Sequence, residues 1–77
     1  MEEESWRGLP PVGTRIRMPY FRVQLEGEVI SHVRIWGEPL ARIRVPVPVS
    51  HEPYETRDVN VSFSAEQIRD QMEIISP

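Results

Sequence analysis

The 77-residue sequence contains no cysteine and no lysine, since all nine basic residues are arginine. Without cysteine, this chain alone cannot form a disulfide or hold a thiolate metal site or an iron–sulfur cluster. It should therefore bind no iron when purified by itself. No apolar run approaches the length of a membrane span or a signal-peptide core, so we expect a cytoplasmic protein without membrane association. The four glycines form no phosphate-binding loop.

The length indicates one domain near the size at which a single core is marginal. Residues 1–12 are acidic and then rich in proline and glycine, which predicts a flexible tail, and residues 13–77 form the predicted domain. Trp6 is the exception within the tail, because a tryptophan there is expected to fold back on the domain or to contact a partner.

From Gly13 onward, apolar residues recur with period two, the pattern of half-buried strands. The stretches are 14–18, 29–35, 41–49 and 59–63. Pro46 and Pro48 lack N–H groups on one side of the third stretch, so that side should be an edge or an opening in the sheet. The predicted inward residues are Ile16, Val29, Val33, Ile43, Val45, Val61 and Ile74.

The C-terminal part predicts one helical turn and a closing strand. Ser64 followed by Gln67 fits a capping box, with a short helix or 3₁₀ turn over residues 65–71. A last strand follows at about 72–75, residues 36–39 form a turn, and residues 50–57 form a longer loop. The predicted fold is all-β, a small SH3-like five-stranded barrel with one short helical turn before the last strand. An open sheet of four or five strands is the alternative.

The catalytic inventory is thin. His32 and His51 lack acidic or thiol partners at ligand spacing, and Ser31 and His32 point to opposite faces of a strand, so neither a metal site nor a triad is expected.

Aromatic and arginine side chains are the better candidates, because both types anchor protein interfaces. Residues 5–57 carry eight Arg against five Glu, a local charge of +3 within a chain of net charge −3. This predicts either an ordinary solvated surface or an arginine face for an acidic partner. Nucleic acid is disfavoured, since a dedicated binder usually has a clearly basic balance. If Arg34 lies opposite Arg42, three like charges share one face. The predicted partner-binding residues are Tyr20, Phe21, Arg34, Trp36, Arg42 and Arg44. The alternative for Phe21 and Trp36 is that they plug the ends of a barrel.

Several segments resemble the variable subunit of ferredoxin-thioredoxin reductase, in matching order from about residue 12 to 76. They are Val12-Gly13-Thr14-Arg15-Ile16-Arg17, Leu25-Glu26-Gly27-Glu28-Val29, Trp36-Gly37-Glu38-Pro39, Pro46-Val47-Pro48-Val49 and Gln71-Met72-Glu73-Ile74-Ile75-Ser76. The segment 19–24 is shorter than the corresponding loop of that family and lacks its histidine, and the stretch around Pro53 and Tyr54 does not align.

The resemblance implies a non-catalytic subunit that forms a heterodimer with a cysteine-rich catalytic subunit, which holds the [4Fe-4S] cluster and the redox-active disulfide. It also implies that the arginine face could assist docking of acidic ferredoxin. A free-standing SH3-like adaptor that binds an acidic protein or peptide segment is the alternative, and a nucleic-acid-binding barrel is a weaker third reading.

Overall fold

The computed structural model describes residues 8–49 and 52–76, and for residues 52–54 the backbone alone. Trp6 and His51, as well as the acidic part of the predicted tail, lie outside the described residues. The elements are β1 (Arg15–Tyr20), β2 (Val23–Ile35), β3 (Glu38–Val49), β4 (Glu52–Phe63), α2 (Ala65–Gln71) and β5 (Glu73–Ser76).

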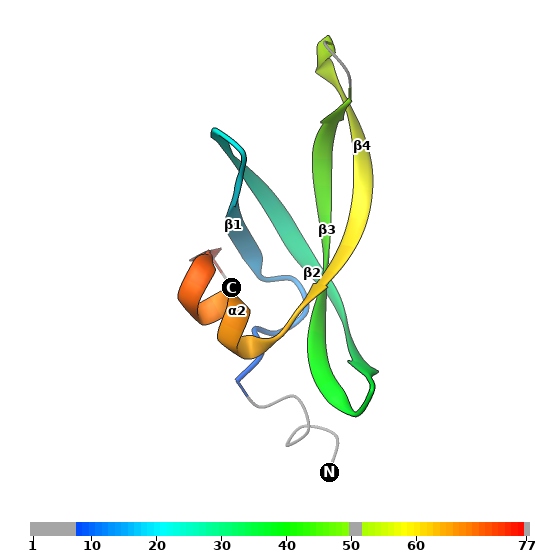
Figure 1. Ribbon diagram of the computed structural model, residues 1–77, viewed down its shortest axis with the longest axis vertical. Coiled ribbons are helices and arrows are strands. Elements are labelled where there is room, and N and C mark those ends of the chain that lie inside the picture. The colour runs from blue at the N-terminus through cyan, green and yellow to red at the C-terminus, as the bar shows by residue number, and fades with distance from the viewer. Residues whose placement is uncertain (1–7, 50–51, 77) are drawn as a thin grey trace.

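The five strands form one antiparallel sheet in the order β4-β3-β2-β1-β5 (Figure 1). The all-β class with one short helix is therefore confirmed. β4 and β5 are the two edges of the sheet and do not pair with each other in the described chain. The closed barrel is thus not confirmed, and the open sheet that the sequence left as the alternative describes the architecture.

The β1–β2 and β3–β4 hairpins diverge at one end of the molecule (Figure 1). β2 pairs with β3 only from Glu28↔Arg44 to Ile35↔Glu38, whereas β3 and β4 stay paired through Pro46 and Pro48. The expected opening beside the two prolines is confirmed, because β2 has left β3 where the N–H groups are missing.

At Gly27, the first residue of β2 beyond the last pair with β3, the two strands still pass very close to each other. A Cβ atom there would lie 2.7 Å from Ile43 Cγ2, 2.9 Å from the Arg44 carbonyl oxygen and 2.9 Å from Val45 Cγ2. Only a glycine permits this approach of two backbones. The glycine of the Leu25–Val29 segment is therefore a packing requirement of the crossing.

The core lies on one face of the sheet, here called the inner face, under α2. Its buried side chains include the predicted Ile16, Val29, Ile43 and Val45, and Val61 packs against them. Three buried members were not predicted: Met18, Ala41 and Ile68.

The prediction that Val33 and Ile74 belong to the core is wrong. Ile30 is an extra residue in β2, since Val29 pairs with Ile43 and Ser31 with Arg42. This β-bulge reverses the alternation, so His32 rather than Val33 shares the inner face with Ala41. Ile74 is 55% exposed because β5 is an edge strand. It lines an open pocket of about 620 Å³ beside α2.

α2 begins and ends as the sequence predicts. Ser64 Oγ accepts a hydrogen bond from the Gln67 N–H, and Gln67 Oε1 accepts one from the Ser64 N–H, which completes the capping box. Ile68 is the buried residue of the helix, with 3% of its surface exposed. Among residues 8–49 and 52–76, no helix is long and apolar enough to cross a membrane.

Part of the predicted tail packs on the domain. Leu9 contacts the core cluster, and His32 Nε2 lies 2.8 Å from the carbonyl oxygen of the buried Pro10. A domain boundary at Gly13 therefore leaves out residues that belong to the packed unit.

The predicted loops are shorter than expected. Residues 52–57 belong to β4 rather than to a loop, with Arg57 opposite Val47 and Thr56 opposite Pro48. Similarly, residues 19–24 are mostly strand around a turn at residues 21–22. The predicted turn at 36–39 contains two turn residues, and β3 begins at Glu38.

Candidate functional site

The six predicted partner-binding residues do not form one surface. Tyr20 and Phe21 lie at the β1–β2 turn, and Trp36 lies at the β2–β3 turn. The 13 residues of β2 separate these turns in a molecule 45 Å long. The two turns are at opposite ends of β2 (Figure 1). The prediction that these aromatic residues share one binding surface is therefore wrong.

Both turns present an aromatic side chain to solvent from a left-handed backbone. Phe21 is 90% exposed and Trp36 is 100% exposed, and each has a φ of 54°. Trp36 with Gly37, whose φ is 81°, has the positive φ pair of a type I′ turn. Bulky residues rarely adopt this conformation. Phe21 is partly supported by an edge-to-face contact with Tyr20, with ring centroids 4.7 Å apart. The exposure of both rings also excludes the reading in which they plug a barrel.

The register also separates the three predicted arginines. Arg34 lies opposite Pro39, and Arg42 lies opposite Ser31. Because of the bulge at Ile30, Arg34 shares the face of His32, whereas Arg42 and Arg44 point to the other face. Arg34 Nη1 donates to the carbonyl oxygen of Gly37 within its own turn, at 3.1 Å. The expected cluster of three like charges is therefore wrong.

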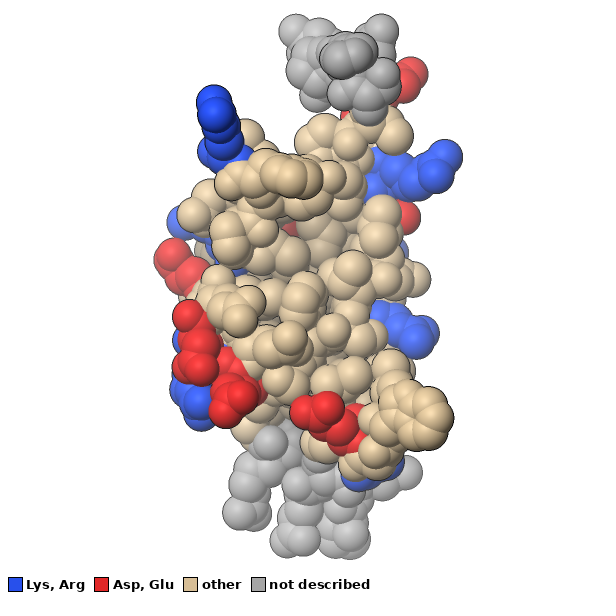
Figure 2. All heavy atoms as spheres, in the orientation of Figure 1, with Lys and Arg blue, Asp and Glu red and all other residues tan. Residues whose placement is uncertain are grey.

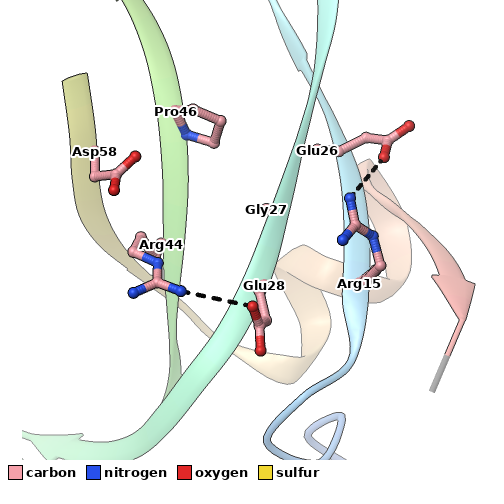
Figure 3. A pocket seen from close by; sticks show the side chains of 7 residues that line it. All are labelled: Arg15, Glu26, Gly27, Glu28, Arg44, Pro46 and Asp58. Carbon is pink, nitrogen blue, oxygen red and sulfur yellow. Dashed lines mark hydrogen bonds and ion pairs between the residues drawn. The ribbon is translucent and has the colours of Figure 1, made fainter. Parts of the chain in front are cut away.

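The face opposite the core, here called the outer face, carries paired charges (Figure 3). Arg15 Nη2 lies 3.2 Å from Glu26 Oε1, Arg17 Nη2 lies 3.4 Å from Glu26 Oε2, and Arg44 Nη2 lies 3.6 Å from Glu28 Oε1. A hydrogen bond from Arg15, which has the larger effect, and one from Arg17 hold the pKa of the Glu26 carboxyl below its usual value. Among these charges lies a polar pocket of about 430 Å³, lined by Arg15, Glu26, Gly27, Glu28, Arg44, Pro46 and Asp58. An arginine paired in this way offers less charge to an acidic partner.

A third pocket, which the sequence did not predict, opens on the inner face between the diverging hairpins. It has a volume of about 350 Å³ and is here called the apolar pocket. Met18, Pro19, Tyr20, Leu25, Val45, Val47, Val59, Val61 and Phe63 line it. It is continuous with the core, because Met18 and Val45 belong to both.

The apolar pocket lies within an uncharged region of the surface. Figure 2 shows the face that bears α2, with uncharged side chains over its middle and charged side chains around its margin. Alternating apolar residues in β3 and β4 were visible in the sequence. Their shared opening was not, because it depends on the divergence of the two hairpins.

The described residues show little catalytic chemistry. Within 8–49 and 52–76, no group of three or more His, Asp or Glu side chains is placed to hold a metal ion. The one His whose position is described, His32, holds the Pro10 carbonyl and thereby the segment before β1. The apolar pocket is the candidate site whose lining is most apolar, and that lining suits apolar contact rather than acid–base chemistry.

No protein-family model, no curated protein and no solved structure matches this chain.

Proposed function

We propose that this chain is a non-catalytic subunit that binds another protein through the apolar pocket. The observation that carries the proposal is the opening of the core between the two hairpins. Half-buried valines of β3 and β4, together with Leu25 and Tyr20, there face solvent on a surface whose charged side chains lie around its margin. Burial of such side chains contributes roughly 25 cal/mol per Å² of apolar surface removed from water.

In the specific form that the sequence resemblance implies, the partner is a cysteine-rich catalytic subunit that holds a [4Fe-4S] cluster in the cytoplasm. The cysteine-free sequence is compatible with this role, because the redox groups would all belong to the partner. The proposal includes an SH3-like form of the sheet, which the five antiparallel strands and the short helix before β5 support. Ferredoxin docking at an arginine face is less favoured, because Arg15, Arg17 and Arg44 are paired with glutamates.

The experiment is co-purification of the tagged chain from its native cell extract, followed by mass spectrometry and iron analysis of the complex. Val59→Asp places a carboxylate in the apolar pocket, and Asn60→Asp adds the same charge on the outer face of the same strand. We expect Val59→Asp to lose the partner and Asn60→Asp to retain it, with circular dichroism confirming that both are folded. Tyr20→Asp at the same pocket serves as a second variant if Val59→Asp does not fold.

Two results would count against the proposal. Retention of the partner by both pocket variants would remove the apolar pocket from the interface. A partner without cysteine or iron would leave the binding role intact but reject the reductase form in favour of the adaptor alternative.

A further inference from the structure

β4 presents a long edge, and the backbone hydrogen bonds of the sheet determine which of its N–H and C=O groups are open. Val29 donates its N–H to the Thr14 carbonyl and accepts from the Gly13 N–H, so its polar groups point toward the β1 side. The next residue back, Glu28, therefore points toward β3 and its partner Arg44 points back toward β2. By alternation, Val45 and Val47 point toward β4.

The same alternation fixes the direction of the β4 backbone. Val59 and Arg57 lie opposite Val45 and Val47 and bond to β3. The N–H and C=O groups of the residues between them point away from the sheet. The residues whose backbone groups point away from the sheet at this edge are Thr56, Asp58, Asn60 and Ser62.

The other open edges of the described sheet are blocked or short. β1 extends past β5, but Pro19 is the residue that points outward there and it has no N–H. Beyond the split, the edge of β3 carries Pro46 and Pro48, and the facing edge of β2 is limited to the five residues 23–27. β5 has four residues. Proline and brevity are two of the usual protections against strand addition, and the stretch of β4 from residue 55 to 63 has neither.

The inner side of β4 is apolar and ends in a positive charge. Val59, Val61 and Phe63 line the apolar pocket, and Arg57 follows on the same face because it lies opposite Val47. Unlike Arg15, Arg17 and Arg44 of the outer face, exposed Arg57 forms no ion pair with any described residue. Glu55 lies two residues beyond Arg57 in the direction away from Val59. The charged group next to Val59 on the inner face is therefore the Arg57 guanidinium. A segment beside β4 would meet three apolar side chains and then a cation.

We propose that the β4 edge takes up an extended segment of the partner protein, with apolar residues at alternate positions and a carboxylate beside Arg57. Its backbone pairs with Thr56–Ser62, and its apolar side chains lie next to those of Val59, Val61 and Phe63. Main-chain hydrogen bonds supply affinity in this mode, and alternate side chains supply specificity. The inference rests on the proposed binding role and adds the mode of recognition and the chemistry of the bound segment.

The test uses the acetylated and amidated peptide Thr-Val-Thr-Val-Thr-Val-Thr-Glu, which in antiparallel register places its valines and its glutamate on the inner face. Amide hydrogen exchange is followed by NMR with the full chain. We expect the peptide to protect the amides of Asp58, Asn60 and Ser62, whereas the amide of Val59 is already protected by β3. Replacing the terminal Glu by Lys should weaken binding about fivefold to tenfold, and Arg57→Glu should reverse that preference.

Matched controls come from the peptide backbone and from one position of β4. N-methylation of the three internal threonines removes the N–H groups that would face β4 and should weaken binding by at least about tenfold, since 1.4 kcal/mol is a factor of ten. N-methylation of the three valines, whose amides face away, should change binding less than about threefold. Asn60→Pro removes one outward N–H and should abolish binding, whereas Asn60→Ala should not.

Absence of protection at the outward amides at millimolar peptide overturns the proposal, as does equal weakening by both N-methylated peptides. Dimerisation of the chain with protection of the same amides in the absence of peptide would assign the edge to a second copy and equally overturn it. If this test fails while Val59→Asp still releases the co-purified partner, the binding role stands and the strand-addition mode does not.

Discussion

Gly27→Ala tests the close crossing of β2 and β3 on which the split between the hairpins depends. The new methyl group would lie under 3.0 Å from three atoms, and one of them is the backbone carbonyl oxygen of Arg44. The other two are Cγ2 atoms of the β-branched Ile43 and Val45, which have few rotamers available. Because Gly27 is not among the residues with positive φ, the expected effect is entirely steric.

Overpacking of this kind destabilises by roughly 1 to 3 kcal/mol. A 77-residue domain has about 4 to 12 kcal/mol of total stability. At about 2 kcal/mol, the melting temperature should fall by about 8 to 16 °C. Thermal unfolding followed by circular dichroism measures this directly. Gly37→Asn is the matched control, because a Cβ there meets nothing within 4 Å and asparagine tolerates positive φ. If Gly27→Ala melts within about 2 °C of the wild type, β2 does not approach β3 as closely as described.

Three further predictions concern the core, the helix cap and the outer face. Ile43→Asp buries an unpaired charge at a site with 0% exposure and should unfold the chain, whereas Val33→Asp should remain folded by circular dichroism; equal damage from both would contradict the bulge. Ser64→Ala should lower stability by about 1 kcal/mol in urea unfolding and speed exchange of the Gln67 amide, and an unchanged amide would mean that the capping box does not form. Glu26→Gln should be less stable than the wild type at neutral pH. Because the folded-state pKa of Glu26 is lowered from its usual 4.5, the stability difference between the two proteins should shrink as the pH falls below 4.5 and vanish below the folded-state pKa. A stability difference that persists in acid would refute the ion pairs.

The sequence by itself determined the features that depend on neighbours along the chain. The limits of α2 follow from the hydroxyl of Ser64 and the amide of Gln67, which lie within one turn of each other. The opening beside β3 follows from Pro46 and Pro48, because a missing N–H acts wherever the strand lies. Period-two alternation identified most of the core for the same reason, since successive side chains of any strand point to opposite faces.

The tertiary structure decided what depends on contacts between distant residues. One extra residue, Ile30, reversed the faces on which Val33 and Arg34 lie. Alternation in the sequence does not reveal at which residue a strand will contain a bulge. The separation of Phe21 from Trp36 depends on β2 continuing unbroken between the two turns. The apolar pocket likewise depends on contacts between strands, because its lining comes from β1, β2, β3 and β4 and the alternation within any one of them does not show that they share an opening.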